Sequence, residues 1–84
     1  MSDSSTTRLV DMVTALAKGL VDHPDQVHVE TDAQGETTVL NLFVASEDLG
    51  QVIGRGGRIA RALRLIVREA AFRTGARVSL EIVD

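Results

Sequence analysis

The 84-residue sequence contains no cysteine, tryptophan or tyrosine, one proline and two phenylalanines. Without cysteine the chain can form no disulfide and can hold no metal through thiolates. The scarcity of aromatic residues excludes the stacking surface on which many nucleic-acid-binding domains hold their bases. No apolar run approaches the roughly 20 residues that span a bilayer, and the N-terminal residues include no apolar stretch of signal-peptide length. We therefore expect a cytoplasmic protein outside the membrane.

The composition is that of one small globular domain, with 44% hydrophobic and 25% charged residues. Its net charge of −3 is unevenly placed. Residues 1–50 hold two basic and nine acidic residues, a net charge of −7, whereas residues 51–84 hold seven arginines and three acidic residues, a net charge of +4. A local basic patch attracts a polyanion more effectively than the total charge indicates. The C-terminal half is therefore the half to search for a binding site.

Three glycines within four positions, Gly54, Gly56 and Gly57, separate two stretches of helical apolar spacing between residues 46 and 74. A continuous helix through them would cost roughly 3 kcal/mol relative to alanine, so the chain is predicted to turn there. The second helix then begins with unbonded N–H groups at the positive end of its dipole, where anions bind. Arg55 and Arg58 add full charges at the same place. This loop suits a sugar-phosphate strand.

The remaining patterns predict the other elements. They are a polar, disordered tail at residues 1–5; a helix from Thr6 or Thr7 to about residue 20; strands near residues 27–31 and 37–44 joined by a loop at 32–35; a short helix capped by Ser46 and ending at Ile53; a long helix closed by Gly75; and a strand near residues 77–82. The predicted order is αββααβ.

The connection from the second strand to the third is long enough for a right-handed crossover, so these strands should lie parallel with the second strand central. The first strand then pairs with the second as an antiparallel hairpin. All three helices should cover one face of this sheet. On the open face, Val39 and Phe43 are consistent either with scattered surface residues or with contact to a partner.

Residues 52–59, VIGRGGRI, resemble the V-I-G-x-x-G-x-I signature of KH domains, and the element order resembles their type II arrangement. The expected fold class is α+β: a single type II KH domain over residues 6–84, with a three-stranded mixed sheet and three helices on one face. The chain is similar to the KhpA family of small bacterial RNA-binding proteins. In KH domains this loop clamps the backbone of about four single-stranded nucleotides while the bases lie along an apolar groove.

The resemblance assigns residues to each role: Gly54, Arg55, Gly56 and Gly57 to the clamp, Arg58 and Arg61 to further phosphate contacts, and Val52, Ile53 and Ile59 to the groove. For Val52 a place in the core is an equal alternative, and Arg64 and Arg68 are equally consistent with a solvated helix face. Glycine rather than a basic residue at position 56 removes one possible charge contact, which should weaken binding.

Other chemistry finds no support in the pattern. The dinucleotide fingerprint and the Walker loop are both absent. His23 and His28 are isolated in the sequence and are expected to be ordinary surface histidines. Turn and cap roles account for the acidic residues beside the predicted helices: Asp22, Asp25, Glu47 and Asp48. We therefore expect no enzyme activity, no metal, no cofactor and no small-molecule substrate.

The leading hypothesis is a non-catalytic protein that binds single-stranded RNA. Resemblance to KhpA implies a homodimer, or a heterodimer with a larger KhpB-like KH-containing protein, that acts as an RNA chaperone in post-transcriptional control of cell shape and wall growth. Two alternatives remain. One is a protein-protein interaction module, and the other is a subunit of a larger ribonucleoprotein that binds little RNA alone.

Overall fold

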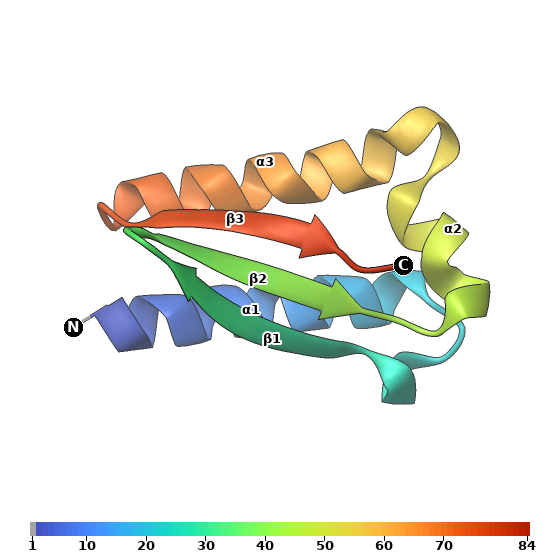
Figure 1. Ribbon diagram of the computed structural model, residues 1–84. Coiled ribbons are helices and arrows are strands. Elements are labelled where there is room, and N and C mark those ends of the chain that lie inside the picture. The colour runs from blue at the N-terminus through green and yellow to red at the C-terminus, as the bar shows by residue number, and fades with distance from the viewer. Residues whose placement is uncertain (1) are drawn as a thin grey trace.

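The computed structural model describes the backbone of residues 2–84 and the side chains of residues 5–84. Its helices and strands are α1 (Ser2–Leu20), β1 (His28–Gln34), β2 (Thr37–Phe43), α2 (Leu49–Ile53), α3 (Arg58–Arg73) and β3 (Arg77–Ile82). Short 3-10 turns lie at Pro24–Gln26, Ser46–Asp48 and Arg55–Gly57. The predicted α+β class and αββααβ order are confirmed (Figure 1). In the part of the chain described, no helix has both the length and the apolarity to span a bilayer.

Helix α1 starts earlier than predicted. It begins at Ser2, so Thr6 and Thr7 lie inside it and neither is its N-cap. Met1 of the predicted disordered tail lies outside the described residues, and residues 2–5 of that tail fall in the first turns of α1. Because serine, threonine and aspartate all favour helix beginnings, the polar N-terminal run allows several starting points, and local pattern alone does not choose among them.

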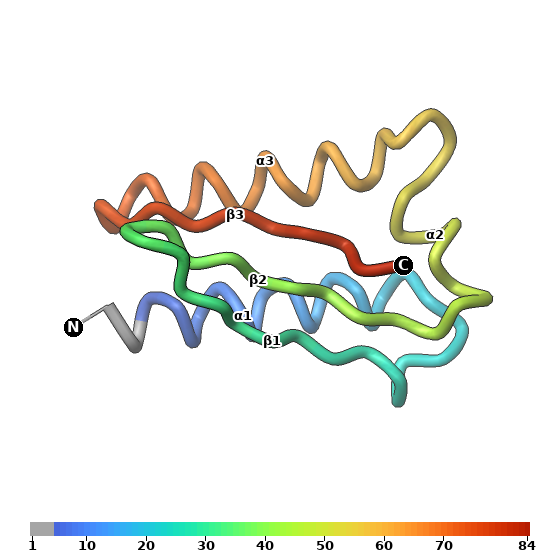
Figure 2. The backbone as a smooth tube through the Cα atoms, viewed as in Figure 1, coloured from blue at the N-terminus to red at the C-terminus, as the bar shows by residue number. Residues whose placement is uncertain are grey.

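The sheet has the order β1-β2-β3, so the prediction of a central second strand is confirmed. Strand β2 pairs antiparallel with β1, with Gln34 opposite Thr37, and parallel with β3, with Leu40 opposite Leu80. Figure 2 traces the long path from the end of β2 through α2 and α3 back to β3. Strand β3 therefore has a neighbouring strand on one side only.

The hairpin is tighter than predicted, because β1 runs to Gln34 and includes three of the four residues assigned to the loop. The loop consists of Gly35 and Glu36 alone. Gly35 has φ 64° and Glu36 has no positive φ, the signs of a type II′ turn, whose twist matches that of antiparallel strands. Pairing with the seven-residue β2 thus extends β1 over residues whose own preference is for turns.

The core lies between one face of the sheet and helices α1 and α3 (Figure 1). Its fully buried members alternate along the strands and recur every three or four residues along the helices, as the periodicity predicts. They are Leu9, Val13 and Ala17 of α1, Leu63, Val67 and Ala71 of α3, Leu40 and Leu42 of β2, and Val78 and Leu80 of β3. Helix α3 ends at Arg73, and Thr74 rather than the predicted Gly75 is its C-cap. Gly75 follows with φ 78°, and its N–H bonds to the Phe72 carbonyl oxygen at 3.1 Å.

On the open face, Val39 is only 8% exposed although no helix covers it. Its cross-strand neighbours there are Asp32 and Ser79. The Phe43 ring packs at a tilt against the ring of His28, with 5.8 Å between centroids. Val39 is thus nearly buried within the open face, and Phe43 is partly covered by His28.

Candidate nucleic-acid interface

The turn predicted between the second and third helices is a tight loop built from glycine conformations. Helix α2 ends at Ile53, and Gly54, Gly56 and Gly57 have φ values of 78°, 66° and 77°. Gly54 also has ψ 171°, a combination that essentially only glycine adopts. Residues with a β-carbon would be strained at each of these positions, so the glycines determine where the helix breaks and how sharply it turns.

On its inner side the loop is closed by Ile59. A β-carbon at Gly54 would lie 2.7 Å from Ile59 Cγ1 and 3.0 Å from the Ile59 backbone nitrogen. Glycine is therefore needed at position 54 because α3 packs closely against the loop. Ile59, predicted to line the nucleic-acid groove, is half-buried and packs beneath the loop and against the core.

On its outer side the loop is open. Arg55 and Gly56 are exposed, and nothing lies within 4 Å of the position that a Gly56 β-carbon would take. The N–H groups of Gly57 and Arg58 are bonded inside the turn, to the carbonyl oxygens of Gly54 and Arg55. Within the described part of the chain, the N–H groups of Arg55 and Gly56 have no backbone acceptor. These two are the donors available to an anion.

An arginine-lined cleft continues from this loop between α3 and the free edge of β3. Its volume is about 430 Å³. Helix α3 contributes Arg61, Arg64, Leu65 and Arg68, and β3 contributes Val78, Ser79, Leu80 and Glu81. The α3 residues follow the i, i+3, i+4, i+7 spacing of one helix face. That spacing was the available sequence signal for Arg64 and Arg68, whereas only the folded chain brings β3 opposite them.

Arg61 joins the cleft to the loop. A β-carbon at Gly57 would lie 3.4 Å from Arg61 Nη1, so the guanidinium group lies against the loop backbone while the same side chain lines the cleft. Among the described residues, Arg61 and Arg64 form no ion pair, and Arg68 makes only a long, exposed one with Glu69 at 3.7 Å. The positive charge on this wall is therefore available to a ligand.

The other predicted site residues separate into different environments. Val52 has no exposed surface, which places it in the core and corrects its assignment to the groove. Ile53 is 36% exposed at the end of α2, next to the loop. Arg58 lies with Ile59 beside a second, largely apolar groove of about 480 Å³ between α1 and α3. Its apolar residues are Ala15, Leu16, Gly19, Leu20, Ile59, Ala62 and Leu63.

The expectation that His23 is an isolated surface histidine is wrong. Its backbone N–H and its ring Nδ1 lie 2.9 Å and 3.0 Å from Oδ2 of Asp48, which is only 1% exposed. Ser46 likewise lies within a 3-10 turn rather than at its N-cap, and the side chain of Asp48 caps no helix. A separation of 25 residues hides this pair from any local pattern. Within the described part of the chain, no cluster of histidine or acidic residues could hold a metal ion.

A helix–glycine loop–helix unit, inserted between a central strand and its parallel edge strand and flanked by a basic cleft, defines this molecule as a type II KH domain. The chain belongs to the family described as "KhpA/KhpB, KH domain", because the model of that family matches residues 10–82.

The chain is similar over nearly its whole length to proteins named RNA-binding protein KhpA. That of Aquifex aeolicus is 49% identical over 77 residues, covering 90% of this chain and 96% of the relative. That of Treponema pallidum is 47% identical over 75 residues, covering 88% of this chain and 92% of the relative. That of Clostridium perfringens is 44% identical over 73 residues, covering 87% of this chain and 97% of the relative. A solved structure of Era from Aquifex aeolicus matches with a TM-score of 0.61 and 19% identity, over 88% of this chain and 29% of Era, which shows a shared fold alone.

Proposed function

We propose that this protein is a non-catalytic RNA-binding protein that holds a single strand along the GRGG loop and the arginine-lined cleft. The observation that carries the proposal is the position of Arg61, whose guanidinium lies against Gly57 and whose side chain also lines the cleft. Loop and cleft thus form one continuous surface for a polyanion. The names of the KhpA relatives support RNA as that polyanion.

The placement of charge indicates how the strand would lie. The cationic side chains of the cleft all come from α3, and its carboxylate comes from β3. Phosphates would follow the loop and the α3 wall, and bases would turn toward the edge of β3. Neither phenylalanine lines the cleft, so the bases would rest on the aliphatic part of Leu65 and on backbone rather than on aromatic rings.

Few phosphate contacts are available to one such domain, so binding should be weak alone and gain from a second domain through avidity. We therefore include in the proposal a homodimer or a complex with a KhpB-like KH-containing protein, acting in the cytoplasm as an RNA chaperone. The role in cell shape and wall growth implied by resemblance to KhpA belongs to the same proposal.

A protein-protein interaction module is the second candidate, and the groove between α1 and α3 favours it. This groove is largely apolar, and Leu16 on its rim is 37% exposed. It shares no lining residue with the arginine-lined cleft. The two functions are therefore compatible, and a variant of the loop can separate them.

The test is a charge reversal in the loop, Arg55→Asp with Gly56→Asp. The matched control is Arg55→Gln with Gly56→Asn. It places polar but uncharged side chains at the same two positions, and its residue 56 must adopt the same positive φ as in the acidic variant. Space is open there, and asparagine and aspartate tolerate left-handed geometry better than other residues. Both variants should fold.

Binding to a fluorescent single-stranded RNA is measured by anisotropy at two salt concentrations. We expect the acidic variant to lose roughly tenfold or more in affinity, because two carboxylates in the clamp repel phosphate. The neutral control should lose less. Unchanged RNA binding by a folded acidic variant would contradict the clamp and favour the protein-interaction candidate.

A further inference from the structure

The two walls of the arginine-lined cleft differ in chemistry. The side chains of Val78 and Leu80 are 7% and 2% exposed and belong to the core, so these residues offer the cleft mainly the peptide backbone of an edge strand. The polar side chains of the β3 wall are Ser79 and Glu81. Among the described residues, Glu81 is thus the only acidic one lining a cleft whose other charged residues are three arginines.

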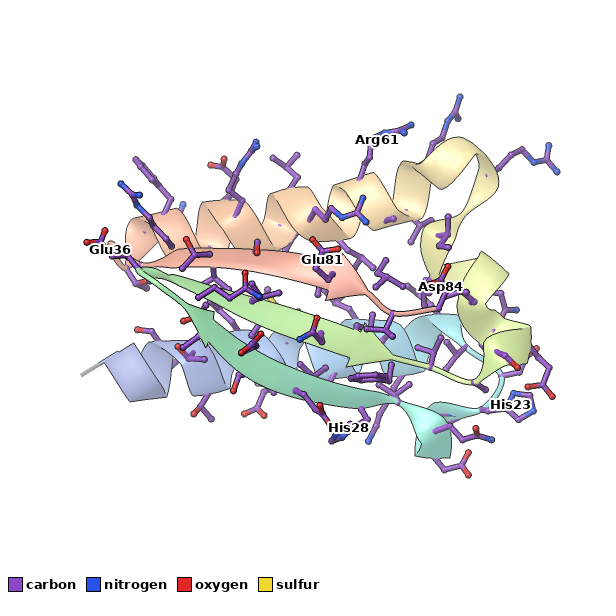
Figure 3. The ribbon with its side chains drawn as sticks, viewed as in Figure 1. His23, His28, Glu36, Arg61, Glu81 and Asp84 are labelled. Carbon is purple, nitrogen blue, oxygen red and sulfur yellow. The ribbon has the colours of Figure 1, made fainter. Side chains whose placement is uncertain are left out.

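The Glu81 carboxylate is not neutralised by those arginines. Among the described residues, the ion pairs are His23–Asp48, His28–Glu30 and Arg68–Glu69, and none includes Glu81. Its cross-strand neighbour on β2 is Asn41, which carries no charge. Figure 3 shows Glu81 on β3 and Arg61 on α3, on the two elements that form the cleft. An exposed, unpaired carboxylate therefore lies where the edges of bases would approach.

A carboxylate only accepts hydrogen bonds, so it selects among bases by the donors they present. Adenine and cytosine each carry an exocyclic amino group, and guanine offers an amino and an imino N–H on one edge. Uracil presents one imino N–H between two carbonyl oxygens, which a carboxylate repels. A phosphate at this position is repelled more strongly still, which keeps the backbone on the α3 wall.

We propose that Glu81 is a base-discriminating residue of the cleft, which accepts hydrogen bonds from amino-bearing bases and disfavours uracil. This inference rests on the proposed RNA-binding function and adds to it the class of base that the cleft prefers. One hydrogen bond from a base amino group to this carboxylate should change the relative affinity for two bases by about fivefold.

The test compares the affinities of the full chain for ten-nucleotide oligomers of adenosine, cytidine and uridine at one salt concentration. The variant is Glu81→Gln, which keeps the shape of the side chain but can both donate to and accept from a base. Its matched control is Glu30→Gln, which removes the same charge from the same face of the sheet on the distant strand β1. Since both side chains are exposed, neither substitution should affect folding.

We expect the wild-type protein and Glu30→Gln to prefer the adenosine and cytidine oligomers to the uridine oligomer. In Glu81→Gln both preferences should fall by about fivefold, chiefly through tighter binding of uridine. Equal strengthening of all three oligomers would mean that Glu81 only repels phosphate, and unchanged ratios would mean that it contacts no base; either result overturns the inference. If the wild-type chain binds none of the oligomers, both the proposed function and this inference fail.

Discussion

The carboxylate of Asp48 holds His23 at two points, because Oδ2 lies 2.9 Å from the His23 backbone nitrogen and 3.0 Å from its ring Nδ1. The pair joins the connection between α1 and β1 to the turn that precedes α2, the helix leading directly into the glycine loop. Figure 3 shows His23 at the end of the molecule where α2 lies. We infer that the pair helps to hold α2, and with it the loop, against the rest of the fold.

The two groups shift each other's titration. The hydrogen bond and negative charge of Asp48 raise the pKa of His23 above 6.5, against a smaller opposing effect of burial, and Glu47 and Asp22 add to the rise. Burial alone would raise the pKa of Asp48. Hydrogen bonds from the His23 ring and from the backbone of His23 and Asp22, with the charge of His23, together outweigh burial and lower that pKa below 3.8.

The first prediction concerns stability against pH. A raised histidine pKa means that the stabilisation is fully present below pH 6.5 and is lost as pH rises through the folded-state value. A lowered carboxyl pKa means that its contribution is present above pH 3.8 and is lost on acidification. Urea midpoints should therefore fall from pH 6 to pH 9 in the wild type, and His23→Gln should flatten this slope. His28→Gln leaves the His23–Asp48 pair intact and should keep the slope of the urea midpoint against pH. A slope that survives in His23→Gln would show that this pair does not cause it.

The second prediction compares two glycines that lie four positions apart. Gly54→Ala should lower the free energy of unfolding by about 3 kcal/mol, because alanine is strained at its φ and ψ and its β-carbon would meet Ile59 at 2.7 Å. Gly50→Ala, within α2 and with open space around it, should raise stability by up to about 1 kcal/mol. Chemical denaturation measures the free energy of unfolding of both variants. Similar changes at positions 50 and 54 would show that α3 does not pack against the loop as described.

The third prediction separates core from surface in the motif. Val52→Ala should cost about 2 kcal/mol of stability, because its side chain is completely buried, and should leave the RNA affinity of the folded protein unchanged. Ile53→Ala should cost less stability and should reduce affinity, since Ile53 is exposed beside the loop. Denaturation and anisotropy on the same samples distinguish the two residues. Reduced affinity in a fully folded Val52→Ala would return this residue to the groove.

The fourth prediction tests the cleft through salt dependence. If Arg64 contacts a phosphate, Arg64→Ala should reduce the slope of log affinity against log salt concentration by about 0.7, the value for one contact to a single strand. Arg73→Ala removes the same charge from the last turn of α3, outside the cleft, and should leave the slope nearly unchanged. Equal changes in the two variants would indicate that only the overall charge of the helix matters.

Much of the fold could be predicted because local patterns specify it. Alternation of apolar residues predicted β2 and β3 to within a residue. Helical spacing predicted the buried positions Leu63, Val67 and Ala71 of α3, but it also placed on that face Ile66, which is 42% exposed. The boundaries of α1 and β1 were missed, because serine, threonine and aspartate are compatible with several local structures. Pairing with β2 decided how far β1 extends.

The candidate site was predicted only in part. Glycines at 54, 56 and 57 indicated the loop because their conformations are nearly closed to other residues. The same periodicity could not tell whether Val52 faces a ligand or the core, since apolar side chains serve in both places. Nor could it pair Arg64 with β3 or His23 with Asp48, because these neighbours are distant in sequence.

By itself, the sequence determined the order of the elements, the break at the glycines and the concentration of arginine in the C-terminal half, since each depends on the conformational limits or charge of single residues and their neighbours. Only the tertiary structure decided which arginines share a cleft, that Glu81 lines the same cleft, and that Asp48 is buried against His23. The first two relationships arise when the parallel crossover brings β3 beside β2 and beneath α3, and the third arises when the connection between α1 and β1 meets the turn before α2. No local rule specifies distances between residues that lie so far apart in the chain.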